Sequence, residues 1–182
     1  MQKVLYLVRH CQATGQAPDA PLTAEGALQA RRLADQLASF SIERIVASPY
    51  ARAVQSIEPL VQRLGLPVHI DARLIERTLS AAPLDDWRAA LRATFEDLDR
   101  CYAGGESSRA AMRRAVAALG DIVVHPARIS AVVTHGNLMT LLLKHLDPAI
   151  GFVFWQQLAT PDLYCVTLGD EATVQRVALA AA

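Results

Sequence analysis

Two side chains that can attack an electrophile stand next to each other near the start of the sequence. His10 and Cys11 follow an apolar run that ends in Arg9, within the stretch VRHCQATGQ. An imidazole and a thiolate are both nucleophiles that can form covalent intermediates. A thiolate that attacks phosphate esters needs an arginine to hold the phosphate, in the pattern cysteine, five residues, arginine. Because the residue at that position is Ala17, the spacing favours His10 as the nucleophile.

Hydrophobic patterns predict strands and helices that alternate along the chain. Short apolar or β-branched runs predict strands at residues 3–8, 42–47, 68–70, 129–134, 163–168 and 173–179. Helices are predicted from Thr23 to Phe40, from Ser48-Pro49 onward with a kink or break at Pro59, and at residues 84–100, 107–119 and 138–146, with a loop at 71–83. This alternation predicts an α/β fold whose sheet is largely parallel in its core.

Polar side chains follow three of the predicted strands at the point where each strand ends. The first strand runs directly into Arg9 and His10. Arg52 lies shortly after the second strand, and His135 follows the fourth. Since ligands bind outside the carboxyl ends of the strands in an open α/β sheet, we expect these side chains to meet. Two arginines, two histidines and helix N termini predict a phosphate pocket that needs no metal.

Transfer of a phosphate ester also requires protonation of the leaving oxygen, which calls for a carboxylic acid near the pocket. Glu76, in the loop after the predicted strand at 68–70, is the candidate for this role. A loop glutamate between Ile75 and Arg77 could instead form a surface ion pair.

Six segments of the sequence resemble the histidine phosphatase superfamily, the group that includes cofactor-dependent phosphoglycerate mutase. They occur in the family's order and cover most of the chain: VRH at 8–10, PLTAEGALQARRLADQL at 21–37, SPYARAVQSIEPL at 48–60, DARLIER at 71–77, GGESS at 104–108 and VVTHGNL at 132–138. The resemblance implies a three-layer α/β/α sandwich around a mostly parallel mixed sheet.

The resemblance also implies roles for individual residues. His10 would form a phosphohistidine, and Glu76 would donate a proton to the leaving group and then activate water. The phosphoryl group would be held by Arg9, Arg52, His135, Gln16 and Gly136. No metal or other cofactor is implied.

The sequence departs from the family pattern close to the proposed nucleophile. Cys11 stands where glycine is usual, Gln12 where glutamate is common, and Ala13 where threonine is common. Gln16 lies near the place of an asparagine that often touches the phosphate. The usual glycine and aromatic pattern after Glu76 is missing, so the substrate side of the pocket is less determined than the set of histidines and arginines.

The cysteines and tryptophans leave further alternatives open. Cys11 is expected to be a small residue tolerated beside the site, with a redox-sensitive thiol activated by neighbouring positive charge as the alternative. Cys101 and Cys165 are predicted to be small buried residues, and the wide spacing of the three cysteines argues against a disulfide or a zinc site. Trp87 and Trp155 either wall the pocket or pack in the core. Structural roles are expected for the other histidines, His69, His125 and His145.

Length and charge limit the class of protein. With 182 residues, 52% hydrophobic residues and a formal net charge of zero, the chain is expected to form one domain over residues 1–182. Without a charged run, neither nucleic acid nor membrane is an expected partner. The apolar stretch before Arg9 is too short for a signal or a span, which favours a cytoplasmic location.

We therefore expect a metal-independent phosphomonoesterase that acts on a small phosphorylated substrate. Mutases of the family carry an insertion after Glu76, where this chain has only SAAPLDDW before its next helix. A mutase-type phosphoryl transfer and a non-catalytic phospho-ligand binding domain remain as alternatives. The sequence predicts neither the natural substrate nor the oligomeric state.

Overall fold

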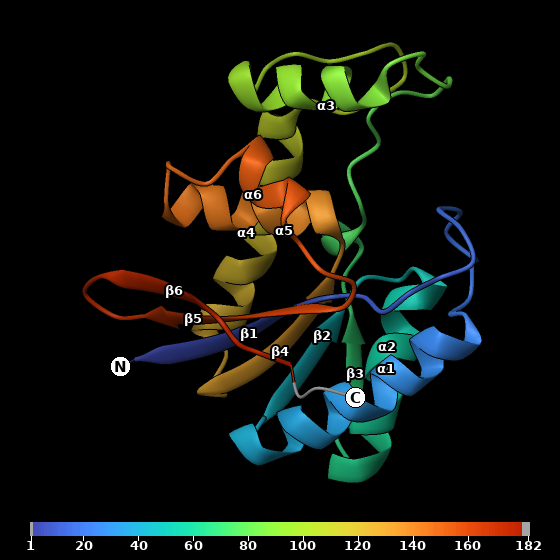
Figure 1. The fold of residues 1–182 in the computed structure, drawn as a ribbon. Coiled ribbons are helices and arrows are strands. Elements are labelled where there is room, and N and C mark those ends of the chain that lie inside the picture. Colours follow the sequence, from blue (N-terminus) through green and yellow to red (C-terminus); the bar gives the residue numbers. More distant parts are fainter. Residues whose placement is uncertain (1, 180–182) are drawn as a thin grey trace.

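The computed structural model describes residues 2–179. Within them a six-stranded sheet has the order β3-β2-β4-β1-β5-β6 (Figure 1). Its strands are β1 (Lys3–Arg9), β2 (Arg44–Ala47), β3 (Val68–Ile70), β4 (Ile129–Thr134), β5 (Asp162–Leu168) and β6 (Ala172–Arg176). Strands β3, β2, β4 and β1 run parallel, while β5 pairs antiparallel with β1 and with β6. This mixed sheet with a parallel core confirms the predicted fold class.

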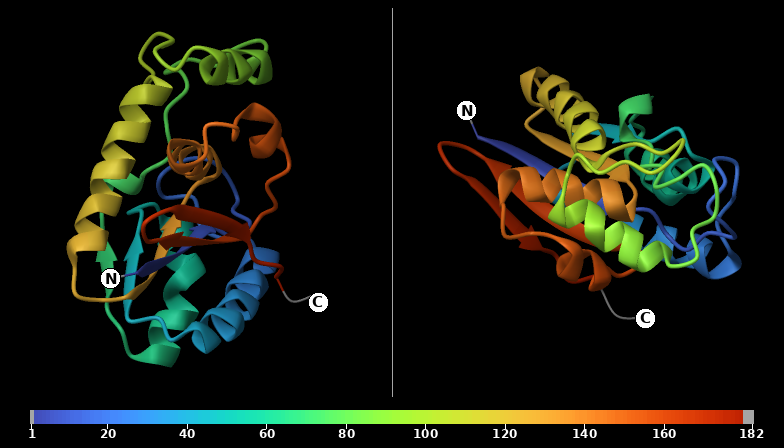
Figure 2. Two further views of the ribbon diagram at one scale, coloured as in Figure 1. Left: turned by 90° about the vertical axis from the view of Figure 1, so that its left-hand side faces the viewer. Right: turned by 90° about the horizontal axis from the view of Figure 1, so that it is seen from above.

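Helices cover both faces of the sheet (Figure 2). They are α1 (Ala24–Leu37), α2 (Ala51–Leu64), α3 (Trp87–Glu96), α4 (Ser108–Val124), α5 (Gly136–Leu146) and α6 (Phe152–Gln156), with single 3₁₀ turns at Ala38–Phe40 and Ala72–Leu74. Side chains of α1 and α2 belong to one buried cluster and those of α4 and α5 to another. The predicted three-layer sandwich is confirmed. In the part of the chain that the structure describes, no helix has the length and apolarity needed to cross a bilayer.

Alternation along the central strands produces the two clusters. On β1, Leu5 and Leu7 belong to the cluster with α4 and α5, and Val8 belongs to the cluster with α1 and α2. On β4, Val132 belongs to the cluster with α4 and α5, and Val133 belongs to the cluster with α1 and α2. Successive strand side chains point to opposite faces, and burial of each large aliphatic side chain contributes roughly 1.5–3 kcal/mol. Both faces of the central strands are therefore anchored, which fixes the positions of their carboxyl ends.

Helix α1 begins as predicted, because the Thr23 hydroxyl accepts a hydrogen bond from the Gly26 N–H at 3.0 Å. Gly26 lies directly against the segment that follows β1. A Cβ at this position would lie 2.0 Å from the Gln12 carbonyl oxygen, so only glycine fits. This contact fixes the chain just after His10.

Helix α2 differs from its prediction at its start and at its proline. It begins at Ala51 with Tyr50 as N-cap, so the predicted start at Ser48-Pro49 is wrong. The Ser48 hydroxyl instead accepts from the Tyr50 N–H at 3.3 Å and contacts a histidine in the site described below. Pro59 does not split the helix, because the buried side of α2 packs against α1 and the sheet and holds it together on both sides of the missing N–H.

Other boundaries shift where local capping overrides periodicity. Phe40 lies in the 3₁₀ turn after α1 rather than in the helix. Helix α3 is shorter than the predicted 84–100, because the Asp86 carboxylate caps it by accepting from the Ala89 N–H at 2.9 Å. Helix α4 extends beyond the predicted 107–119, α5 starts two residues earlier than predicted, and β6 ends before the predicted 179. The five-residue helix α6 is absent from the prediction, because one turn carries no periodic signal.

Candidate active site

The ends of three neighbouring strands bring the predicted residues together. Strand β4 lies between β1 and β2, so residues that follow the three strands are neighbours. The His10 N–H donates to the Thr134 carbonyl at 3.0 Å, and the Ser48 N–H donates to the Val133 carbonyl at 3.0 Å. His135 follows Thr134 directly. The predicted meeting of polar residues at this edge of the sheet is therefore confirmed.

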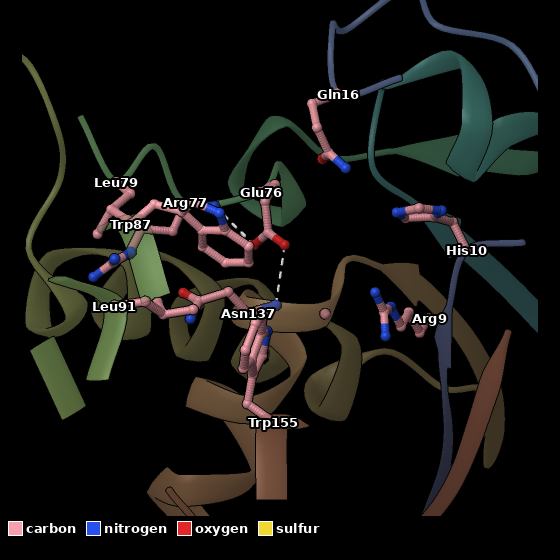
Figure 3. A pocket seen from close by; sticks show the side chains of 11 residues that line it. Arg9, His10, Gln16, Glu76, Arg77, Leu79, Trp87, Leu91, Asn137 and Trp155 are labelled. Atoms are coloured by element: carbon pink, nitrogen blue, oxygen red, sulfur yellow. Dashed lines mark hydrogen bonds between the residues drawn. The ribbon is translucent and has the colours of Figure 1, made fainter. Parts of the chain in front are cut away.

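A pocket of about 440 Å³ lies beyond this edge. Its lining residues are Arg9, His10, Gln16, Glu76, Arg77, Leu79, Trp87, Leu91, Gly136, Asn137 and Trp155 (Figure 3). Figure 3 shows Arg9 and His10 on one side of Glu76, Leu79, Trp87 and Leu91 on the other, and Trp155 below it. We call the first part the charged end (Arg9, His10, Gln16 and Gly136) and the second the apolar end (Leu79, Trp87, Leu91 and Trp155). Pockets that hold whole small molecules span roughly 300–1,000 Å³, so this one is larger than phosphate alone requires.

The ring of His10 is held in one tautomer. Its Nδ1 lies 2.7 Å from the Cys11 carbonyl oxygen, which can only accept, so Nδ1 carries the proton. Nε2 is then unprotonated, and its lone pair accepts a hydrogen bond from Arg52 Nε at 3.2 Å. Burial lowers the pKa of His10 to about 4, and the Arg52 and Arg9 charges act in the same direction. At neutral pH, Nε2 is therefore unprotonated, the state in which an imidazole nitrogen can act as a nucleophile.

His135 lies behind His10 and is fully buried, with the two ring centroids 5.1 Å apart. Its Nε2 is 2.8 Å from the Ser48 hydroxyl, and within residues 2–179 its Nδ1 has no partner. Burial holds the pKa of His135 well below its usual value, so the ring is neutral. A Ser48 hydroxyl that donates to Nε2 leaves the proton on Nδ1, where it can be offered to an anion. His135 does not line the pocket itself.

Arg9 lies at the mouth of the charged end. Its Nη1 donates to the carbonyls of Leu158 and Ala159 at 3.1 and 3.0 Å, while its buried Nε has no partner within the described residues. Gly136 packs against this guanidinium, because a Cβ there would lie 3.0 Å from Arg9 Nε. Gly136 therefore positions Arg9, and Nε remains available to a ligand.

Arg52 contacts His10 from below the pocket surface. It is 1% exposed, and its Nη1 donates to the carbonyls of Gln16 and Ala17 at 3.1 and 2.8 Å. Its Nε donates a hydrogen bond to His10 Nε2, the atom that would carry a phosphoryl group. The structure thus brings Arg52 to the predicted place beside His10, while Gln16 contributes its side chain to the pocket wall.

Glu76 lies at the boundary between the two ends of the pocket. Its carboxylate accepts from the N–H groups of Asn137, Leu138 and Arg77 at 3.0, 2.9 and 2.9 Å. Two of these donors belong to the first turn of α5, so Glu76 caps that helix. The alternative of a surface ion pair is wrong, because the carboxylate is bound by backbone N–H groups inside the pocket. To deliver a proton into the pocket, Glu76 must release at least one of these bonds.

Two polar residues of the pocket were not predicted as site residues. Arg77 is 5% exposed and Asn137 is 6% exposed, and both line the pocket. Within residues 2–179, Arg77 Nε and Nη2 and both amide atoms of Asn137 lack a hydrogen-bond partner. An unpaired buried polar group costs about 1–3 kcal/mol, so these atoms are suited to a ligand or to water. Adjacency to Glu76 and Gly136 was the sequence signal that could have identified them.

Cys11 agrees with its main prediction, whereas Cys101 and Cys165 are less buried than predicted. Cys11 is fully buried, and burial raises the pKa of its thiol to about 11. This excludes the redox-sensitive alternative, which requires an accessible thiol of lowered pKa, and agrees with a small tolerated residue. Cys101 is exposed in the turn after α3, so its predicted burial is wrong, and Cys165 is half-buried.

The fold and this edge of the sheet define an α/β protein with a pocket that contains histidine and arginine side chains. The family model of the histidine phosphatase superfamily (branch 1) matches residues 5–177. The chain belongs to this superfamily.

Individual relatives include both mutases and phosphatases. A probable phosphoglycerate mutase GpmB of Salmonella choleraesuis (strain SC-B67) is 28% identical over 171 residues, which cover 84% of this chain and 77% of the relative. The mycobacterial glucosyl-3-phosphoglycerate phosphatase with inorganic phosphate is 25% identical, with a TM-score of 0.76 and coverage of 98% of this chain and 97% of that one. Bacillus stearothermophilus YhfR has a TM-score of 0.79 at 22% identity, with 96% of each chain covered. The last of these shows similarity of fold alone.

Proposed function

We propose that this chain is a phosphomonoester hydrolase that works through a phosphohistidine at His10. The observation that carries the proposal is the unprotonated Nε2 of His10, fixed by the Cys11 carbonyl and placed between two arginines at the floor of a pocket. The mycobacterial relative whose structure contains inorganic phosphate is a phosphatase by its name, which supports phosphate as the bound group.

In the first step, His10 Nε2 attacks phosphorus and the bond between phosphorus and the ester oxygen breaks. The proton for the leaving alcohol comes from the Glu76 carboxyl. Charge develops on the phosphoryl oxygens during the transfer. These oxygens are bound by the guanidinium groups of Arg9 and Arg52 and by the Nδ1–H of His135. Arg9 Nε has no partner among the described residues, whereas Arg52 Nε must leave His10 Nε2 for a phosphoryl oxygen as Nε2 forms its bond to phosphorus.

In the second step, water attacks the phosphohistidine. Glu76, now a carboxylate, takes a proton from that water, the bond between phosphorus and nitrogen breaks, and inorganic phosphate leaves. His10 returns to its starting tautomer because the Cys11 carbonyl still holds Nδ1. The protein thereby supplies the nucleophile, the acid and base, and the positive charge from its own side chains.

A mutase is the second candidate, since curated relatives carry that name. A mutase returns the phosphoryl group to the organic substrate, whereas a hydrolase passes it to water. Incubation with 3-phosphoglycerate separates them, because released inorganic phosphate indicates hydrolysis and an isomerised ester indicates transfer.

The central experiment uses an aryl phosphate in the presence of a chelator. His10→Ala is expected to lower turnover roughly 10³-fold or more, because the covalent step is lost. The matched control is His145→Ala, an exposed histidine of α5, which should keep full activity. An acid-labile phosphoenzyme should be trapped in the wild type and be absent in His10→Ala. Turnover that is unaffected by His10→Ala would contradict the proposal, and a complete lack of turnover would favour the non-catalytic binding domain.

A further inference from the structure

Both tryptophans of the chain lie in the pocket, and the proposed chemistry uses neither of them. Trp87 is the first residue of α3 and Trp155 belongs to α6. Their rings meet edge to face, with centroids 5.9 Å apart and an angle of 89° between the planes. Two helices far apart in the sequence thus each contribute an indole to the same wall.

Trp87 is not required by the hydrophobic core. Its side chain is 46% exposed, whereas large apolar residues that support a fold are buried. A second cavity of about 300 Å³, lined by Leu79, Pro83, Leu84 and their neighbours, also borders Trp87. The indole therefore has open space next to it outside the pocket as well as inside it.

Trp155 is held firmly enough to act as a platform. Phe152 stacks on it with centroids 5.5 Å apart and an angle of 23° between the planes. Arg92 from α3 covers the Phe152 ring at 5.3 Å. An aromatic surface that is fixed before binding loses little entropy when a ligand packs on it.

The direction in which the substrate extends follows from the proposed chemistry. The phosphoryl group lies at the charged end against His10, and Glu76 must reach the ester oxygen from the middle of the pocket (Figure 3). The alcohol portion then continues beyond Glu76, where the wall is formed by Leu79, Leu91 and the two indoles together with the polar side chains of Arg77 and Asn137.

We propose that the alcohol portion of the substrate carries an aromatic ring, which packs against Trp87 and Trp155. Aromatic pairs attract one another beyond the area that they bury. A sugar would leave hydroxyls at its edge against Leu79 and Leu91, which offer no hydrogen-bond partner. The unpaired atoms of Arg77 and Asn137 can bind a polar substituent on the ring. This inference rests on the proposed phosphatase function.

The test compares phosphate esters of primary alcohols, whose leaving oxygens are similarly basic. We expect kcat/KM for 2-phenylethyl phosphate to exceed that for ethyl phosphate at least tenfold, and to exceed those for 2-cyclohexylethyl phosphate and glucose 6-phosphate. Higher kcat/KM for the cyclohexyl ester or for glucose 6-phosphate would overturn the proposal in favour of general apolar bulk or of a sugar.

Variants connect this preference to the tryptophans. Trp155→Ala and Trp87→Ala should each reduce the ratio between the phenylethyl and ethyl esters at least threefold, while Trp155→Phe should keep most of it. The control Val153→Ala truncates a 61% exposed side chain of the same helix and should leave the ratio unchanged. Unaltered ratios in the folded alanine variants, judged by near-UV circular dichroism, would contradict the proposal.

Binding can be measured without turnover, because the only tryptophans in the sequence report on this pocket. In the His10→Ala protein, 2-phenylethyl phosphate should change the intrinsic fluorescence at concentrations at least tenfold lower than ethyl phosphate does. Equal fluorescence responses to the two esters would overturn the inference. Hydrolysis of both esters at equal rates would also overturn it, yet leave the phosphatase proposal intact. Absence of hydrolysis combined with the expected fluorescence difference would reject the phosphatase proposal alone.

Discussion

The charged and apolar ends of the pocket are built on different principles. The charged end is made of residues at or after the ends of strands β1 and β4, and Arg52, which follows β2, lies beneath it. Main-chain carbonyls bind the side chains of Arg9, His10 and Arg52. The apolar end is made of two helices and a loop that lie away from the sheet, and one of its tryptophans is nearly half exposed (Figure 1). Under the proposed function, the groups that react are attached to the sheet, where their positions are fixed, whereas the residues that contact the alcohol portion of the substrate are attached to peripheral helices.

Exchange of a guanidinium for an ammonium should have very different effects at the two ends. Arg9→Lys keeps the charge but loses the planar fork that binds the Leu158 and Ala159 carbonyls while leaving Nε for a ligand. We expect kcat/KM to fall about 100-fold, in the range seen when one donor to developing charge is removed. Arg88→Lys, which changes the exposed arginine over the Trp87 ring, is the matched control and should alter kcat/KM less than threefold. Equal losses in the two variants would remove the distinction between the ends.

Addition of one methyl group at the charged end tests how tightly it is packed. Gly136→Ala places a Cβ 3.0 Å from Arg9 Nε, so the guanidinium must shift by a few tenths of an ångström. We expect kcat/KM to fall about tenfold, since small displacements at reacting groups are costly. Gly120→Ala in α4 is the control, because no atom lies within 4 Å of its added Cβ. That variant should keep full activity and gain about 0.5–1 kcal/mol of stability.

Protonation provides a third test of the charged end. Because burial lowers the pKa of His10 to about 4, its ring C–H signals in NMR should keep the neutral chemical shift at pH 6 and move only near pH 4. In the unfolded chain the same group takes up a proton near pH 6.5, so the unfolded state binds more protons between these values. Stability should therefore decrease as pH falls from about 6.5 toward 4, which urea unfolding can measure. A His10 signal that titrates near pH 6.5 would contradict the buried, neutral nucleophile.

The smallest effect is expected at Cys11. Cys11→Ser retains the main-chain carbonyl that binds His10 Nδ1, so kcat/KM should change less than threefold, at a stability cost of about 1–3 kcal/mol for a buried hydroxyl. In the wild type, a thiol reagent should label exposed Cys101 rapidly and Cys11 only after unfolding. Rapid labelling of Cys11 with loss of phosphoenzyme would indicate that the Cys11 thiol takes part in the reaction.

The two ends also differ in how well the sequence predicts them. The charged end could be predicted because Arg9 and His10 come at the end of the apolar run at residues 3–8, and Gly136 comes shortly after the β-branched run at 129–134. The apolar end could not, because α6 is a single turn and the face of α3 that holds Trp87 depends on where Asp86 caps the helix. Arg77 and Asn137 were missed for a related reason, since only tertiary burial reveals that their polar atoms lack partners. Ser48 was predicted to cap α2, but its hydroxyl contacts His135. Both contacts use the same hydroxyl, and the sequence does not show which of them forms.

The position of Glu76 couples catalysis to the integrity of a helix. Its carboxylate accepts from two N–H groups in the first turn of α5, the helix that begins directly after His135. Removal of a helix cap typically costs 0.5–2 kcal/mol, so a Glu76 variant loses stability together with its acid, and its kinetics must be interpreted beside its melting temperature. If Glu76 is the proton donor as proposed, its substitution affects both the chemistry and the first turn of α5, whereas neither tryptophan caps a helix.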